Sequence, residues 1–179
     1  MIEWDGRQLN LVDLPYNTTA VNERAVELAV TFDWLTGRTG HGLEVGNVLA
    51  HYGHTGHRVV DLTEQSEHVD NLDVFDIGGR YDWIVSISTI EHVHWDDRHD
   101  PDAAALAIAH LRSLLATGGH LLVTIPIGWH PTLDRLLPLD ADLWGCWSHE
   151  SSGWRPCDLE PVDYGPRWAN KVWIGEWRN

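Results

Sequence analysis

The chain has 179 residues, 43% of them hydrophobic and 22% charged, which is ordinary for a globular protein and too mixed for a disordered one. This length supports one well-buried core and is short for two, so we expect a single domain over residues 1–179. The 27 acidic residues against 12 Lys and Arg give a formal net charge of -15. Because nucleic acid and anionic membrane surfaces are bound through basic patches, neither is an expected partner.

The N-terminal residues MIEWDGRQ lack the basic start and apolar run of a signal peptide. No apolar run approaches the roughly 20 residues that a membrane span needs. We therefore predict a cytoplasmic protein. The two cysteines, Cys146 and Cys157, are too few for a disulfide framework and are expected to be free thiols. A zinc site built from them and His149 lacks the usual ligand spacing.

One amphipathic helix is predicted in the N-terminal segment, residues 1–38. Its apolar positions recur at helical spacing from Val21 to Leu35, and Gly37 ends it. Residues 17–19 (Asn-Thr-Thr) supply side chains that can cap its start. This helix is expected to lead into the sheet.

The next part, residues 39–130, alternates between strand and helix patterns. A brief helix is predicted to end near Gly53, and a longer one to open at residues 100–101 and to stop at residues 118–119. Apolar runs predict strands at residues 42–45, 58–62, 72–75, 81–88 and 120–125. This alternation favours a mostly parallel sheet covered on both faces, a Rossmann-like, doubly wound α/β fold.

The C-terminal part, residues 131–179, has a different pattern. Strands are predicted at residues 143–149 and 171–178, joined by a loop without a convincing helix. Such a connection suits antiparallel pairing, so these two strands are expected to form an antiparallel edge and to complete seven strands. The loop holds Pro156, Pro161 and Pro166.

Tryptophan is concentrated in the same part of the chain. Of the 11 tryptophans, those between residues 144 and 173 are Trp144, Trp147, Trp154, Trp168 and Trp173. We expect them to pack against apolar surface. The alternatives are a platform for the methyl acceptor and a homodimer contact through this edge. Trp129, just after the fifth strand, is placed at the pocket.

In open α/β sheets, ligands bind beyond the carboxyl ends of the strands. Gly46 follows the first strand without the further glycines of a GxGxxG turn, and the chain has no GxxxxGK[ST] loop. A pyrophosphate cofactor, and with it a nicotinamide-dependent reductase, is therefore disfavoured. Asp61 lies 17 residues beyond Glu44 at the end of the second strand, where a carboxylate can accept both ribose hydroxyl hydrogens. A nucleoside without a phosphate fits both observations.

The segment from about residue 40 to 130 resembles class I S-adenosylmethionine-dependent methyltransferases. Residues 44–46 (Glu-Val-Gly) are similar to the first motif of that class, and Asp61 is similar to its ribose-binding acid. Residues 71–76 are similar to its adenine segment and residues 81–93 to its fourth-strand motif. Residues 116–126 resemble the glycine-containing element before the fifth strand. Residues 22–24, 43–49 and 51–52 resemble a small bacterial and phage branch of the class.

The resemblance implies S-adenosyl-L-methionine as cofactor and residues 39–130 as the cofactor-binding core. The residues expected to bind it are Arg24, Glu44, Gly46, Asn47, Asp61, Leu62, Asp73, Val74, Asp76 and Ser88. For Arg24 the implied partner is the cofactor carboxylate, with a solvated helix face as the alternative. For Glu44 the alternatives are a helix cap or a pair with Arg24. For Asp73 and Asp76, an equal alternative is that backbone groups hold the adenine.

The expected reaction is methyl transfer to the oxygen or nitrogen of a small-molecule or sugar-like acceptor. The candidate catalytic residues are Glu91, His92 and His130, because a histidine can act as a base near neutral pH. For His92, a structural hydrogen bond is an equal alternative. No metal is expected, because Ser88 stands where metal-binding relatives have an acid. Residues 131–179 are expected to supply the acceptor side.

Val48 departs from the first motif, since most members of the class have a second glycine at this position. A side chain there narrows the space for the methionine arm. A noncatalytic nucleoside-binding or interaction module of the same fold is therefore the alternative function.

Overall fold

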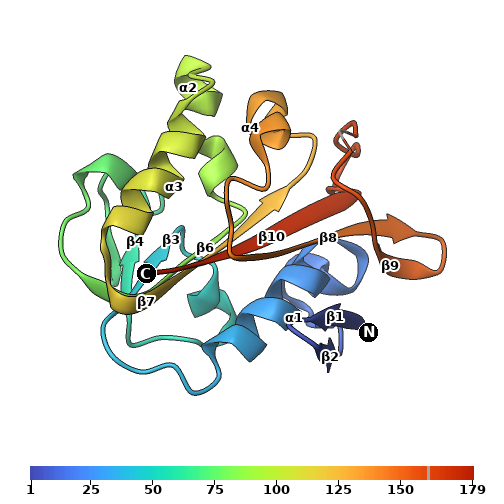
Figure 1. Ribbon diagram of the computed structural model, residues 1–179, viewed down its shortest axis with the longest axis horizontal. Helices are drawn as coiled ribbons and strands as arrows, with labels where there is room; N and C mark the ends of the chain where they lie inside the picture. The colour runs from blue at the N-terminus through green and yellow to red at the C-terminus, as the bar shows by residue number, and fades with distance from the viewer. Residues whose placement is uncertain (161) are drawn as a thin grey trace.

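The computed structural model describes residues 1–160 and 162–179 (Figure 1). Within these residues, an eight-stranded sheet has the order β5-β4-β3-β6-β7-β10-β8-β9, beside a separate hairpin of β1 and β2. The bounds are β1 Ile2–Trp4, β2 Arg7–Leu9, β3 Gly42–Val45, β4 Arg58–Val60, β5 Val69–Asp70, β6 Tyr81–Ile87, β7 Leu115–Pro126, β8 Leu143–Glu150, β9 Gly153–Pro156 and β10 Lys171–Arg178.

Strands β5, β4, β3, β6 and β7 are parallel, and the chain winds outward in both directions from the neighbouring strands β3 and β6. Strand β10 is antiparallel to both β7 and β8. These pairings confirm the mostly parallel, doubly wound sheet with an antiparallel edge. The strand number differs from the prediction for two reasons. Strand β9 folds back on β8, with His149 opposite Trp154, and the N-terminal segment forms the hairpin of β1 and β2 before its helices.

Two helices cover opposite faces of the sheet (Figure 1). Helix α3 (Ala103–Ser113) packs over the face that contains Ile84, and helix α1 (Arg24–Leu35) packs over the face that contains Val85. Because successive side chains of a strand point to opposite faces, a strand buried on both faces has a continuous apolar run. This is why the sequence predicted the central strands β3 and β6 correctly.

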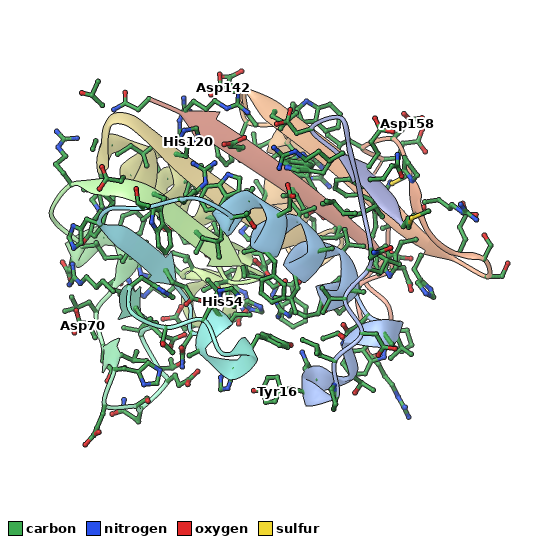
Figure 2. All side chains as sticks on the ribbon, turned by 90° about the horizontal axis from the view of Figure 1, so that it is seen from below. Tyr16, His54, Asp70, His120, Asp142 and Asp158 are labelled. Atoms are coloured by element: carbon green, nitrogen blue, oxygen red, sulfur yellow. The ribbon has the colours of Figure 1, made fainter. Side chains whose placement is uncertain are left out.

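The shorter helices lie mainly in the connections between strands. They are η1 (Tyr16–Val21), η2 (Leu49–Tyr52), η3 (Val74–Asp76), η4 (Ile90–His92), α2 (Trp95–Arg98) and α4 (Pro131–Leu136). Helices η1 and η2 lie side by side, since the Tyr16 ring stacks on His51 with centroids 4.7 Å apart and meets Tyr52 edge-on (Figure 2). The N-terminal segment therefore lies next to the turn that follows β3.

The predicted cap of α1 at residues 17–19 is wrong. Asn17 and Thr18 have left-handed backbone angles inside η1, and the Thr19 hydroxyl hydrogen-bonds the backbone before η1. Helix α1 begins at Arg24, whose N–H donates to the Asn22 side chain at 3.1 Å. Apolar spacing did not reveal that a separate turn precedes the helix.

Three other predicted boundaries are also wrong. The third strand is Val69–Asp70, and part of the predicted segment forms η3. Residues 100–101 precede the start of α3, which follows Asp102. Helix α3 ends at Ser113, and Gly118 and Gly119 lie inside β7. A Cβ on Gly119 would come within 2.9 Å of the Tyr81 carbonyl oxygen. This glycine therefore allows β7 to approach β6 closely and does not end the helix.

The C-terminal tryptophans are mostly part of the core, as expected. Trp147, Trp154 and Trp173 are buried, whereas Trp144 is 43% exposed. Trp173 lies on β10, between β7 and β8, and not at the edge of the sheet, while the homodimer stays a prediction. Of the loop prolines, Pro156 ends β9, Pro166 precedes β10, and Pro161 lies outside the described residues.

Candidate functional site

A cavity of about 460 Å³ lies at the carboxyl ends of β3, β4 and β6. This is where the winding direction of the sheet reverses, the usual ligand position in open α/β folds. The predicted site residues that line it are Gly46, Asp61, Leu62, Asp73, Val74, Ser88 and His92. The predicted residues Arg24, Glu44, Asn47, Asp76, Glu91 and His130 are not part of its lining.

The turn after β3 is built around Gly46, which has φ +87. A Cβ on Gly46 would collide with the Thr89 side chain, so only glycine fits this position. Glu44 is fully buried, and its Oε1 accepts the N–H groups of Val48 and Leu49, each at 2.8 Å. Its Oε2 lies 2.8 Å from His57 Nε2. Glu44 therefore holds the turn in the helix-capping role, away from the cavity lining.

The Asp61 carboxylate is fixed by the loop after β4. Its Oδ1 accepts the N–H groups of Thr63 and Glu64, each at 2.8 Å. Its Oδ2 accepts no hydrogen bond within the described part of the chain. The carboxylate is thus oriented by one oxygen and can use the other for a ligand. Asn47 is buried and donates to the Glu64 side chain, so it supports this loop from behind.

A second acid lines the cavity at the start of η3. Asp73 Oδ1 accepts the Phe75 N–H, and Oδ2 lies 2.7 Å from His94 Nε2. Burial raises the pKa of Asp73, but the hydrogen bonds from His94 and Phe75 outweigh burial and leave this pKa below its ordinary value. Asp73 is therefore a carboxylate at neutral pH. Asp76 is exposed and lies outside the cavity lining.

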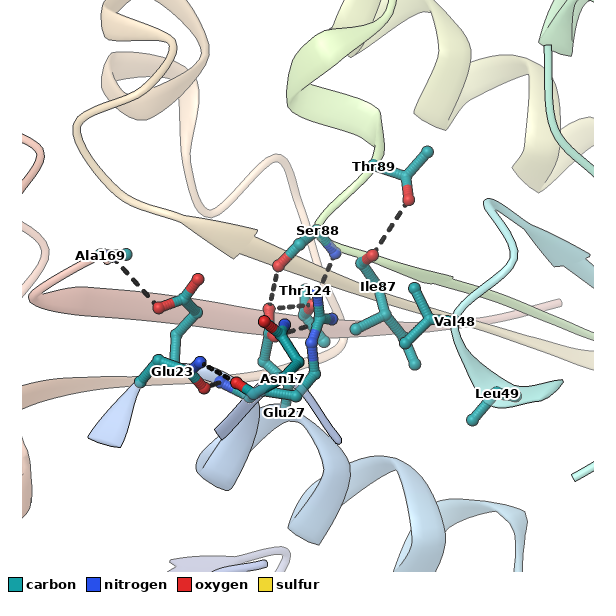
Figure 3. Close-up of polar contacts among 12 residues, drawn as sticks. Asn17, Glu23, Glu27, Val48, Leu49, Ile87, Ser88, Thr89, Thr124 and Ala169 are labelled. Carbon is teal, nitrogen blue, oxygen red and sulfur yellow. Dashed lines mark hydrogen bonds and ion pairs between the residues drawn. The ribbon is translucent and has the colours of Figure 1, made fainter. Parts of the chain in front are cut away.

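A buried polar network lies beneath the end of β6 (Figure 3). The hydroxyls of Ser88 and Thr124 both donate to Oε1 of the fully buried Glu27. Arg24 Nη1 lies 3.0 Å from the other oxygen of Glu27. Arg24 therefore has a protein carboxylate as its partner in this structure. The sequence signal that could have revealed Glu27 is an acid inside the apolar run of residues 25–30.

His92 lines the cavity and is held by an acid that the sequence analysis missed. His92 Nδ1 lies 2.7 Å from Asp96 Oδ2, and Asp96 Oδ1 accepts the Trp129 indole N–H at 3.2 Å. The ring of Trp129 lies 5.0 Å from that of His92. With Nδ1–H donating to the Asp96 carboxylate, the neutral imidazole of His92 carries its lone pair on Nε2. The i, i+4 spacing of His92 and Asp96 was the available signal.

Glu91 and His130 are not exposed to the cavity in this structure. Both Glu91 oxygens are buried and have no hydrogen-bond partner among the described residues. Burial raises the pKa of Glu91 well above its ordinary value. His130 is buried, its Nδ1 accepts the Leu133 N–H at 3.1 Å at the start of α4, and burial lowers its pKa. His130 is thus a helix cap, and the prediction of a catalytic role for it finds no support.

No group of three His, Cys, Asp or Glu side chains within residues 1–160 and 162–179 could hold a metal ion. In the same residues, no helix is both long enough and apolar enough to cross a membrane. Cys146 and Cys157 are free thiols, with their sulfur atoms 3.2 Å apart.

Comparison of the sequence with protein-family models gave no match, and comparison with curated proteins gave none. The structure is similar to N-methyltransferase NodS from Bradyrhizobium japonicum WM9 in complex with S-adenosyl-L-homocysteine. The TM-score is 0.58 at 16% identity, over 93% of this chain and 92% of that chain.

A second similar structure is Burkholderia thailandensis 1,6-didemethyltoxoflavin-N1-methyltransferase with bound 1,6-didemethyltoxoflavin and S-adenosylhomocysteine. Its TM-score is 0.54 at 18% identity, over 92% of this chain and 81% of that chain. These matches cover nearly the whole chain, and they confirm that it has the Rossmann-like fold of class I S-adenosylmethionine-dependent methyltransferases.

Proposed function

We propose that this protein is an S-adenosyl-L-methionine-dependent methyltransferase that acts on a small molecule. The observation that carries the proposal is the cavity at the sheet's switch point, with Asp61 oriented by its loop and one carboxylate oxygen left for a ribose. The fold shared with methyltransferases crystallised with S-adenosylhomocysteine supports the same cofactor.

The lining of the cavity fits the parts of this cofactor. Leu62, Leu72 and Val74 offer apolar surface for an adenine, beside the carboxylate of Asp73. The turn at Gly46 and the end of β6 at Ser88 offer room for the methionine arm. When bound, the cofactor supplies a methyl group on a sulfonium ion, and an acidic cavity suits this positive charge.

Val48 was the main reason to expect a degenerate site. Its side chain is not among the cavity-lining residues and packs with the apolar cluster beneath α1. The missing second glycine therefore does not by itself fill the cavity. This supports a working cofactor site over a noncatalytic module.

His92 is the residue best placed to act as a base. It lines the cavity, and the hydrogen bond to Asp96 directs its Nε2 lone pair away from Asp96. A base in this position removes a proton from an oxygen or nitrogen acceptor, while the walls of the cavity hold acceptor and methyl group in line. Asp96 stabilises the positive charge that His92 then carries.

Calorimetry with S-adenosylmethionine and S-adenosylhomocysteine tests this function. We expect both to bind, and NADH not to protect the protein against thermal unfolding. If neither S-adenosylmethionine nor S-adenosylhomocysteine binds, the methyltransferase proposal is refuted. Binding without release of S-adenosylhomocysteine, across amines, alcohols and sugars, would instead identify the noncatalytic nucleoside-binding module.

A further inference from the structure

The network beneath β6 continues into a group of buried acids that the proposed function leaves without a role. We name Glu23, Glu27 and Glu91, with Arg24 and Tyr164, the acid compartment. Glu27 and Glu91 are fully buried and Glu23 is 9% exposed. Burial, followed by the charges of Glu23, Glu91 and Glu27, raises the pKa of Tyr164 to about 12, so the tyrosine shares the same environment.

We propose that the acid compartment binds the ammonium group of an alkylamine, and that this amine is the methyl acceptor. The proposal rests on the methyltransferase function above and names the substrate class of the same site. It stands on the excess of buried carboxyl groups over cations, on the unpartnered carboxyl of Glu91, and on the position of the compartment behind the cavity wall.

The excess of acids follows from the partners of each group. Arg24 is the single guanidinium or ammonium group paired with these acids among the described residues, and it contacts Glu27. The other Glu27 oxygen accepts two hydroxyl groups (Figure 3). Among the described residues, Oε2 of Glu23 accepts the Ala169 N–H at 3.1 Å. One cation therefore faces three acids, and a second positive charge would be stabilised there.

Glu91 is the most direct sign of a missing ligand. Neither of its oxygens has a hydrogen-bond partner in the described residues, and the nearest histidine nitrogen, His92 Nε2, lies 3.6 Å from Oε1. Buried carboxyl groups are normally hydrogen-bonded. An ammonium ion supplies three N–H donors and the charge that would allow Glu91 to ionise.

The compartment lies one side chain behind the cavity. Ser88 and His92 line the cavity, and Ser88 donates to Glu27 while His92 contacts Glu91. Outside the cavity lining, the Trp129 ring lies 5.0 Å from that of His92 and 5.2 Å from that of Tyr164. Their faces favour a cation by cation–π attraction.

The charge of the cavity agrees with an amine and disfavours an anionic acceptor. Its described lining contains four aspartates, Asp61, Asp73, Asp96 and Asp97, and neither Lys nor Arg. A carboxylate or phosphate substrate would meet repulsion and no cationic partner. A neutral alcohol would not balance the carboxylates that form when Glu23 and Glu91 lose their protons.

The amine reacts in three balanced steps. The acceptor ammonium ion first loses one proton to Nε2 of His92. The lone pair of the amine nitrogen then forms a bond to the methyl carbon, while the carbon–sulfur bond breaks and its electron pair stays on sulfur. The methylated ammonium product leaves, and His92 releases its proton to solvent.

The probes for this proposal are n-butylamine and benzylamine, with n-butanol, benzyl alcohol and butyrate as matched compounds. Each is titrated by calorimetry into the full chain, with and without S-adenosylhomocysteine, in two buffers of different ionisation enthalpy. Burial and the nearby Glu27 raise the pKa of Glu23 to about 7, and burial raises that of Glu91. These carboxyl groups therefore carry protons before an amine binds and lose them when they pair with its ammonium group. We expect amines to bind with release of protons, and alcohols and butyrate not to bind.

The variant Glu91→Gln keeps the shape of the side chain and the neutral state that burial favours. We expect it to fold normally, to weaken amine binding at least tenfold and to leave binding of S-adenosylhomocysteine unchanged. The matched control is Glu67→Gln, at an exposed position outside the site, which should change neither. With S-adenosylmethionine, the amines and not the alcohols should yield S-adenosylhomocysteine.

Three results would overturn the proposal. The first is no amine binding in either condition, and the second is turnover of alcohols but not amines. The third is that Glu91→Gln weakens the binding of S-adenosylhomocysteine but not that of 5′-methylthioadenosine, which lacks the amino acid arm. The ammonium group of the cofactor itself would then occupy the compartment. Failure of the proposed function is separate: it appears as loss of cofactor binding, whereas amine binding to the protein alone still tests the compartment.

Discussion

At the scale of single residues, two carboxylates of the parallel strands have different tasks. Glu44 on β3 uses both oxygens within the protein, on the backbone of η2 and on His57. Asp61 after β4 uses one oxygen on its own loop and lines the cavity with the other left open. The number of unused acceptor atoms, more than residue type or position, separates a structural acid from a ligand-binding one.

Asp61→Ala should weaken S-adenosylhomocysteine binding by about 1–3 kcal/mol, because the ribose hydroxyls lose their acceptor. Calorimetry measures this directly. Asp61→Asn is the better-folded comparison, since an amide oxygen can still accept the N–H groups of Thr63 and Glu64. It should retain the thermal stability of the unmodified protein and still bind more weakly. Unchanged affinity in both variants would mean that the ribose lies elsewhere.

Asp96 is a positioning residue, because it acts through His92. Asp96→Asn should lower kcat about 100-fold, as expected when general-base catalysis is impaired, and leave S-adenosylhomocysteine binding intact. The activity loss should depend on pH and become smaller in alkaline buffer, where the acceptor loses its proton without help. Trp129→Phe removes the N–H donated to Asp96 together with part of the ring that lies beside His92, and should have a smaller effect because His92 keeps its bond to Asp96. A pH-independent loss would indicate a structural role.

At the scale of elements, the start of α1 makes stability depend on pH. Burial, and then the charge of Glu27, raises the pKa of Glu23 from 4.5 to about 7. The folded protein therefore holds a proton that the unfolded chain releases between these values. The contribution of Glu23 to stability is most favourable below pH 4.5, falls as the pH rises from there, and is constant above about 7.

Glu23→Gln should remove this contribution, since an amide does not titrate. Denaturant unfolding at pH 5 and pH 8 measures it. The quantity to compare is the free energy of unfolding of the variant minus that of the unmodified protein. We expect this difference to be more positive at pH 8 than at pH 5. Glu67→Gln, at an exposed position, should give equal differences at the two pH values. Equal differences for Glu23→Gln as well would show that Glu23 ionises normally.

At the scale of the whole molecule, the excess of acids should oppose the compact state. With 27 acidic residues against 12 Lys and Arg, the excess negative charges repel one another more strongly in the folded chain than in the expanded one. Raising NaCl from about 20 to 150 mM should therefore raise Tm at pH 8, because salt screens exposed charges. The increase should shrink at pH 5. A lower Tm in salt would mean that attractive ion pairs outweigh this repulsion.

The architecture was predictable from the sequence because it depends on local patterns. Runs such as that of β6 are apolar on both faces, and this marks a central parallel strand whatever its neighbours are. Short elements were less predictable, since β5 has only two residues and β9 is defined by its pairing with β8. Tertiary contacts define these strands, and no local pattern does.

The candidate site was predictable only in part, for a related reason. Motif positions such as Gly46, Asp61 and Ser88 reach the cavity because they directly follow strands whose ends meet. Glu27 and Asp96 were missed, because their partners lie on other elements or inside a short helix. Arg24 was given a ligand as partner, although the nearest acid one helical turn away, Glu27, contacts it in the folded chain.

The position of β10 also constrains when this sheet can be completed during synthesis. Strand β10, Lys171–Arg178, fills the gap between β7 and β8, so within the described residues it connects the hairpin of β8 and β9 to the parallel strands. A ribosome-bound chain that lacks these residues exposes the apolar edge of β7, including Val123 and Ile125. Non-local pairing of this kind is slow and aggregation-prone. We therefore expect the nascent chain to be most prone to aggregation before the residues of β10 are available for pairing.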